Sequence, residues 1–324
     1  MTQDRPVLGI LLMLGFCVVA PLGDAVVKLL GTSVPVLVLL VMRFGIQALI
    51  LVPIVISRGG LGWLRRSVIG WIALRTLLHM AAIAAMFTAL KYLPLADAVA
   101  ISFVMPFLML LLGRFLLGEE VGMRRIIACL VGFGGTLMVV QPSFAEVGWP
   151  ALWPLVVAVL FSLFMLVTRQ IARGTDPIGL QAVSGAMAVV LLIPAWFLAS
   201  ALEVAPSDLA AVSAVDWGLL VSVGLMGTVA HLLMTWALRF APAATLAPMQ
   251  YLEIPLATVF GFLMFGDLPN LLASAGIAVT IGAGIYVVLR EHAVARATTR
   301  LKEQAEAGLS RLTPPPEPAP AQAP

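Results

Sequence analysis

The chain has 324 residues, of which 61% are hydrophobic and 11% are charged, and its formal net charge is +3. A soluble domain carries about 25% charged residues, so a mean hydropathy of +1.08 excludes a soluble globular protein. The basic residues are spread over short connections and form no surface for nucleic acid. Continuous apolar runs, without alternation, exclude a membrane β-barrel. The composition therefore predicts an all-α polytopic membrane protein.

Ten apolar runs of about 20 residues, the length that crosses a bilayer as a helix, follow one another along the chain. The first is longer than the apolar part of a signal peptide, so we interpret it as a retained helix. The connections are short and leave no room for a domain outside the membrane. The predicted spans are 7–28, 34–56, 68–90, 95–117, 124–141, 151–170, 178–200, 216–238, 243–265 and 271–290.

The chain becomes polar from Glu291 onward, and its last residues, TPPPEPAPAQAP, lack the side chains to pack a core. We predict a partly disordered cytoplasmic tail over 291–324. Cys17 and Cys129 both lie within apolar runs and are interpreted as small buried side chains. Two thiols cannot form a zinc site alone, and we expect no metal site and no cofactor.

The basic residues predict the orientation in the membrane. If the N-terminus is cytoplasmic, only Lys28 and Lys91 fall on the outer side, and the connections 141–150 and 201–215 carry acidic but no basic residues. Because cytoplasmic segments of membrane proteins are enriched in Lys and Arg, both termini are predicted to be cytoplasmic, in a multi-pass protein of the cell inner membrane. The basic residues on that side are Arg5, Arg58, Arg65, Arg66, Arg114, Arg124, Arg125, Arg169, Arg173, Arg239 and those from Arg290 onward.

One internal repeat is visible. ALKYLPLADAVAISFVMPFLMLLLGRFLLGEE (89–120) aligns without a gap to ALRFAPAATLAPMQYLEIPLATVFGFLMFGDL (237–268). The alignment pairs Pro94 with Pro242, and Gly113 with Gly261. It predicts two repeats, residues 1–145 and 146–290, with five spans each. Because five is odd, the halves cross the membrane in opposite directions, as in secondary transporters that hold substrate between inverted repeats.

The same segments resemble the EamA-type half of the drug/metabolite transporter superfamily. DAVVKLL at 24–30 and VMRF at 41–44 are similar to that family's first two helices. The resemblance implies ten helices in two inverted repeats and transport of a metabolite of unspecified class. It is closest to a bacterial branch that includes carriers for riboflavin and S-adenosylmethionine. The halves differ, because Asp97 aligns with Thr245, and Met105 aligns with Glu253.

Glu253 and Pro255 fall in the middle of the span predicted over 243–265. A charge at the bilayer centre costs about 2.5–3.5 kcal/mol on insertion scales, so it faces a cavity or a partner. Pro255 donates no N–H and opens the backbone beside the glutamate. We predict a helix break or hinge at Pro255, and at Pro106 in the other repeat. The alternative for Glu253 is a protonated side chain bonded between helices.

Three further ionisable residues lie within predicted spans. Arg75 and His79 are four residues apart and share a helix face, and His231 lies in the eighth span. A histidine titrates near neutral pH and can carry a proton through a transport cycle. The alternative is that both histidines only pack.

Arg43 and Gln47 share a face of the second span. The partner of Arg43 is open between Asp24, Asp97, Glu253 and an anionic group on the substrate, and a purely structural ion pair is the alternative. Asp24 and Lys28 have the i, i+4 spacing of a helical ion pair. Asp97 begins a span, where a helix N-terminus favours a carboxylate.

Aromatic and amide side chains are candidate walls of a binding cavity for a planar or zwitterionic metabolite. Glycines near residues 132–135 and 282–284 are interpreted as helix contacts, within one chain or in a homodimer. The candidate walls are Tyr92, Phe103, Trp236, Gln250 and Tyr251.

These patterns favour a secondary transporter, and not an enzyme, that takes a small metabolite through the lipid bilayer. No nucleotide-binding loop is present, so a proton, an ion or a counter-substrate is expected to drive it. The alternatives are an exporter of the same fold, a membrane-embedded enzyme, and a non-transporting sensor or scaffold. Only two histidines lie in the predicted spans, on different helices, which disfavours the enzyme.

Overall fold

The structure is a computed structural model. It describes residues 6–31, 33–60, 66–105, 107–108, 123–172, 175–202, 212–240 and 250–286, with single positions at 62, 64, 112, 289 and 293. Pro106, most of the predicted tail over 291–324, and the stretches 113–122 and 241–249 lie outside the described residues.

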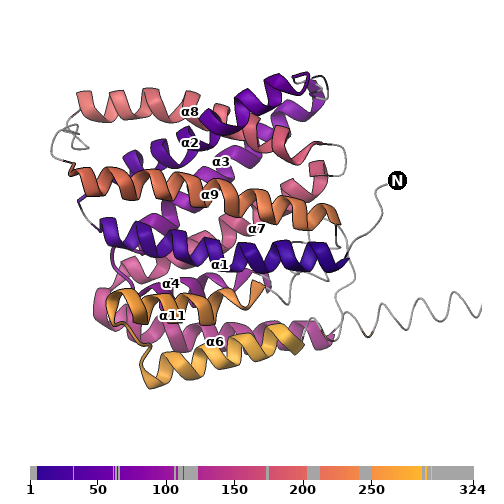
Figure 1. The fold of residues 1–324 in the computed structure, drawn as a ribbon. Helices are drawn as coiled ribbons and strands as arrows, with labels where there is room; N and C mark the ends of the chain where they lie inside the picture. Colours follow the sequence, from indigo (N-terminus) through magenta and orange to yellow (C-terminus); the bar gives the residue numbers. More distant parts are fainter. Residues whose placement is uncertain are drawn as a thin grey trace, which may run out of the picture.

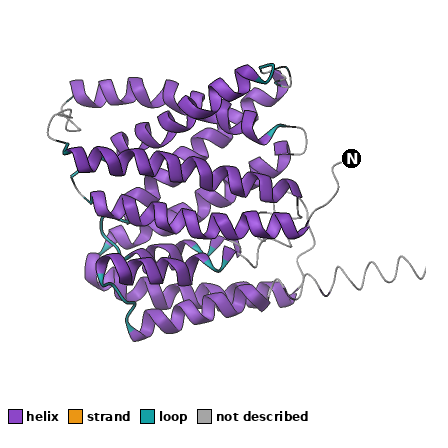
Figure 2. Ribbon diagram, viewed as in Figure 1, coloured by secondary structure: helices purple, strands orange, loops and turns teal. Residues whose placement is uncertain are grey.

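Every regular element in the described part of the chain is helical (Figure 2). Seven helices there are long and apolar enough to cross a membrane. A shorter apolar helix spans Leu271–Tyr286. The elements are α1 (Pro6–Leu30), α2 (Val36–Ser57), α3 (Arg66–Ala89), α4 (Leu95–Ser102), α6 (Met123–Val147), the 3₁₀ turn η1 (Trp149–Leu152), α7 (Trp153–Ala172), α8 (Pro177–Ala201), α9 (Ala214–Phe240) and α11 (Glu253–Phe265).

Polar and apolar side chains are distributed as in a membrane protein. Arg43 and Arg75 are fully buried inside the bundle, whereas Leu49 is 74% exposed and Val190 is 70% exposed on the outside. In water this distribution would expose a large apolar surface, but in a bilayer the apolar side chains meet lipid. The chain is therefore a multi-pass membrane protein.

The helices pack side by side in pairs that are distant in the sequence (Figure 1). The most extensive contact joins α1 to α9, and the next join α2 to α8 and α3 to α7. The short helices α4 and α11 contact each other as well. α6 and the helix Leu271–Tyr286, drawn in yellow, lie together at one edge of the bundle (Figure 1). The centre of the bundle is therefore built from helices of the first and the second half of the chain.

The two short helices are interrupted at matching places. The chain turns at Phe103–Val104 after α4, and at Tyr251–Leu252 before α11. These pairs occupy the same positions in the repeat aligned above, and the rings of Phe103 and Tyr251 pack with their centroids 5.5 Å apart. Pro255 is the third residue of α11, where its missing N–H costs no helical hydrogen bond. In the described residues the irregular backbone thus lies before Glu253, and not at Pro255.

Two local expectations are wrong. The helix predicted over 124–141 continues to Val147, and η1 follows almost at once, so the connection predicted over 141–150 is largely helical. Lys28 does not pair with Asp24. Its Nζ lies 2.6 Å from Oδ2 of Asp267, because the end of α1 lies beside the turn that follows α11.

Small residues set the contact between α6 and the helix Leu271–Tyr286. A Cβ added to Gly135 would lie 2.8 Å from the carbonyl oxygen of Gly276 and 2.9 Å from the backbone nitrogen of Thr280. Both neighbours are backbone atoms that cannot rotate away. Backbone approach of this kind is a common way for membrane helices to associate.

We therefore expect Gly135→Ala to destabilise the protein by about 1–3 kcal/mol, the usual cost of overpacking. The measurement is thermal unfolding of the purified protein in detergent. Gly134→Ala is the matched control, because a Cβ at Gly134 has no neighbour within 4 Å. Equal melting temperatures for the two variants would contradict this helix contact.

Candidate functional site

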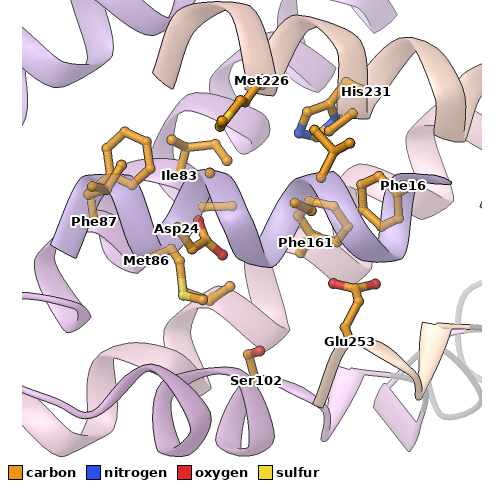
Figure 3. Close-up of a pocket in the computed structure, with 18 of the residues that line it drawn as sticks. Phe16, Asp24, Ile83, Met86, Phe87, Ser102, Phe161, Met226, His231 and Glu253 are labelled. Atoms are coloured by element: carbon orange, nitrogen blue, oxygen red, sulfur yellow. The ribbon is translucent and has the colours of Figure 1, made fainter. Parts of the chain in front are cut away.

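A cavity of about 130 Å³ lies inside the bundle. Helices α1, α3, α4, α7, α9 and α11 contribute to its walls, together with Arg43 of α2 (Figure 3). Most of the lining is apolar, with a small number of polar groups, which is the usual composition of a small-molecule site. The polar side chains are Asp24, Arg43, Ser102, His231, Gln250 and Glu253.

Two carboxylates face this cavity from different helices. Asp24 comes from α1, and Glu253 comes from the first turn of α11 (Figure 3). The unsatisfied N–H groups of a helix N-terminus favour a negative charge, so the break before Glu253 makes its position less costly. Neither carboxylate has a hydrogen bond or ion pair with any residue that the structure describes.

Arg43 is held rigidly at the cavity wall. Its Nη1 donates to Oε1 of Gln47 and its Nη2 donates to the carbonyl oxygen of Gly227, both at 2.8 Å. The side chain is 2% exposed. It fits because residue 227 is a glycine, since a Cβ there would overlap the guanidinium group. Arg43 and Asp24 attract each other electrostatically without forming a direct ion pair among the described residues.

Amides continue this network across the bundle. Nε2 of Gln47 donates to the carbonyl oxygen of Gln181 at 2.8 Å. Nε2 of Gln181 in turn donates to Oγ1 of Thr235 at 3.1 Å. Arg43 and Gln47 are on α2, Gln181 is on α8 and Thr235 is on α9, so buried hydrogen bonds tie three helices beside the cavity. A satisfied buried network of this kind fixes the positions of its members.

The two buried histidines contact each other. Nε2 of His79 lies 3.2 Å from Nε2 of His231, and the ring of His79 stacks on Phe164 at 4.6 Å. One ring must donate and the other accept, so the pair shares a single proton in this contact. Within the described residues, Nδ1 of each ring has no hydrogen-bond partner. His231 lines the cavity, and His79 lies behind it.

Arg75 does not reach the cavity. Its Nε donates to Oγ1 of Thr168 at 3.0 Å and its Nη1 donates to Oγ of Ser184 at 2.8 Å. Its guanidinium carbon lies 4.6 Å from the centre of the Phe164 ring. Arg75 therefore ties α3 to α7 and α8, one turn before His79.

The other predicted residues divide between the cavity and its surroundings. Phe103 and Gln250 line the cavity. Tyr251 is buried beside Phe103 but is not among the lining residues. Trp236 packs near Leu51, and Tyr92 is 51% exposed beyond the end of α3.

Asp97 lies in the first turn of α4, as expected, and its Oδ2 accepts a hydrogen bond of 3.1 Å from Oγ of Ser143 on α6. No side-chain hydrogen bond caps the N-terminus of α4. Asp97 therefore connects two helices, at a distance from the cavity lining.

Several lining residues were missed by sequence reasoning. Asp24 was considered as an ion-pair partner of Lys28 or of Arg43 and not as a cavity wall, although a carboxylate within a predicted span was itself a signal of a cavity. Apart from Ser102, the remaining ones are apolar and give no such signal, because the same side chains also pack helices and face lipid. They include Phe16, Phe87, Phe161, Met86, Met105 and Met226.

The model of the EamA-like transporter family matches two segments, residues 7–141 and 148–290. The chain belongs to this family. The matches cover nearly all of the described helices, including all the elements around the cavity.

Several proteins with similar sequences carry names that state a substrate. A protein named riboflavin transporter, from Brucella anthropi, is 28% identical over 82% of this chain and 92% of its own length. A protein named S-adenosylmethionine uptake transporter, from Rickettsia bellii, is 24% identical over 83% of this chain and 89% of its own length. A crystal structure superposes with a TM-score of 0.61 over 90% of this chain and 99% of the other, at 18% identity, which shows a shared fold.

Proposed function

We propose that this EamA-like protein is a secondary transporter that carries a small organic metabolite through the bilayer by alternating access. The observation that carries the proposal is the cavity: a mainly apolar space inside the bundle with a few polar groups, at the meeting of helices from both halves of the chain. The relatives named for riboflavin and S-adenosylmethionine transport support a metabolite of that size class as the substrate. The proposed role is transport without catalysis.

The proposed architecture is ten helices in two inverted repeats. The family model matches each half of the chain separately, which supports a repeat. The helix contacts support the inversion: if α1 and α3 of the first half correspond to α7 and α9 of the second, then the contact of α1 with α9 corresponds to that of α3 with α7. The contacts of α2 with α8 and of α4 with α11 would then lie on the pseudo-twofold axis.

The size of the cavity fits a closed step of the cycle. Pockets for small molecules usually measure about 300–1,000 Å³, and this one measures about 130 Å³. Binding of a whole metabolite would therefore require the halves to separate. The turns beside Phe103 and Tyr251 lie between them and are suitable points for that movement.

We further propose that the protein lies in the inner membrane with both termini cytoplasmic. The distribution of Arg and Lys over the connections supports this orientation. A proton gradient is a candidate energy source, because His79 and His231 form a contact that depends on a single shared proton.

Glu253→Gln tests the proposal, and we expect it to reduce transport at least about tenfold, because it removes an ionisable group at the cavity wall while keeping the volume of the side chain. The measurement is uptake of labelled riboflavin and S-adenosylmethionine into liposomes that contain the purified protein, with loading on either side to give the direction. Glu146→Gln is the matched control, because Glu146 is exposed on α6 and outside the cavity. Absence of protein-dependent flux for both compounds and for a wider set of vitamins, amino acids and nucleosides would reject a transport function.

A further inference from the structure

The ionisable groups around the cavity do not balance in their charged forms, because two carboxylates face one arginine. Asp24 and Glu253 are close enough to repel each other electrostatically. The lining contains one fixed cation, Arg43, and its Nη1 and Nη2 are already directed to Gln47 and to the carbonyl oxygen of Gly227. Among the described residues, therefore, no cation balances the second carboxylate when both are ionised.

An unbalanced charge inside a membrane protein is costly, and a bound group of opposite charge removes that cost. A neutral or anionic ligand in this cavity would leave both carboxylates without a direct partner. A ligand with one positive charge, together with Arg43, would balance the charges of the two carboxylates. The charge balance alone therefore favours a monocation.

The walls suit the same class of ligand. Phe16 and Phe161 lie on the side of Glu253 in Figure 3, and Phe87 also lines the cavity, at the other side of the view. The faces of aromatic rings attract organic cations and also stack on planar groups. A small inorganic cation would require oxygen ligands on all sides, and this mainly apolar lining does not supply them.

A second polar group independently points to a ligand. His231 is 6% exposed and lines the cavity, and its Nδ1 has no hydrogen-bond partner among the described residues. A buried ring nitrogen without a partner is rare in folded proteins. A hydrogen-bonding group on a bound molecule would provide that partner, a donor or an acceptor according to the tautomer of His231.

We propose that Asp24 and Glu253 form the recognition site for an organic monocation that carries a planar group, held between the two carboxylates against the aromatic walls. This inference rests on the proposed transport function and adds the charge of its substrate. It assigns Asp24 and Glu253 to direct contact with the positive group, one from each half of the chain.

The test is binding to the purified full-length protein in detergent, measured by thermal shift and calorimetry at constant pH. The probes are pairs that differ in charge but little in shape: S-adenosylmethionine with its uncharged thioether, S-adenosylhomocysteine, and tryptamine with tryptophol. Riboflavin is added as a neutral planar compound. We expect at least one cation to bind about tenfold or more tightly than its uncharged partner, as is usual for a buried charge contact.

The variants Asp24→Asn and Glu253→Gln should each reduce that preference for the cation at least about threefold, with little effect on any neutral compound. Their unliganded melting temperatures show whether each variant folds, and Glu146→Gln should leave the preference unchanged. The inference is overturned if no cation binds more tightly than its partner, including the case in which none binds. It is also overturned if both folded variants keep the full preference. Protein-dependent flux of a neutral compound alone would retain the transport function and reject the cation site.

Discussion

Gly227→Ala is expected to abolish transport, although it adds a single methyl group. The new Cβ would overlap Nε and Cζ of Arg43. Because Arg43 is 2% exposed, the guanidinium group would have to leave its hydrogen bonds with Gln47 and Gly227 and move into the cavity. Overpacking of this kind costs about 1–3 kcal/mol of stability. The measurements are uptake into liposomes and thermal unfolding in detergent.

Gly218→Ala is the matched control on the same helix, because a Cβ at Gly218 has no neighbour within 4 Å. Alanine is the better helix former by about 0.8–1.0 kcal/mol in water, so this variant should be at least as stable as the natural protein and equally active. Equal transport and stability for the two alanine variants would show that Arg43 is not confined by residue 227.

Arg75→Met is expected to remove transport while leaving stability unchanged or higher. Among the described residues, Arg75 has no carboxylate partner, and its Nη2 has no hydrogen-bond partner. Replacement of a buried ion by an apolar side chain of similar volume is often neutral or stabilising. The hydroxyl of Thr168 would keep its hydrogen bond of 2.7 Å to the carbonyl oxygen of Phe164.

We expect transport to fall at least about tenfold. A charge at this depth of a membrane protein is costly, and residues that keep one there are usually functional. Arg75 joins α3 to α7 and α8 next to the histidine pair, where the proposed halves must move against each other. The measurements are uptake and the free energy of unfolding, with exposed Arg58→Met as control. Normal uptake would mean that Arg75 has no part in the cycle. A stability loss of about 3 kcal/mol or more would make it a structural anchor.

Much of the fold is predictable from the chain alone, because the bilayer imposes simple rules. The apolar runs predicted over 7–28, 34–56 and 178–200 are helices within a few residues of their expected ends. A buried arginine or glutamate in such a run also predicts a polar interior, since lipid does not accept it. Arg43 and Glu253 were found in this way, and both line the cavity.

Local spacing was a poor guide to partners. Asp24 and Lys28 have the spacing of a helical ion pair, yet Lys28 bonds Asp267, which is 239 residues away in sequence. Asp24 faces the cavity instead. The i, i+4 spacing identifies side chains that share a helix face. It does not identify their partners, because the ends of other helices that lie nearby offer competing groups.

The sequence by itself determined the apolar helices, the repeated segment and the few charges that must avoid lipid, because hydropathy and helix length act locally along the chain. Only the tertiary structure decided which of those charges share a cavity, which are bonded behind it, and that Gly227 leaves space for Arg43. The physical reason is that a side chain's environment depends on the helix packed against it. In this protein those helices come from opposite halves of the chain.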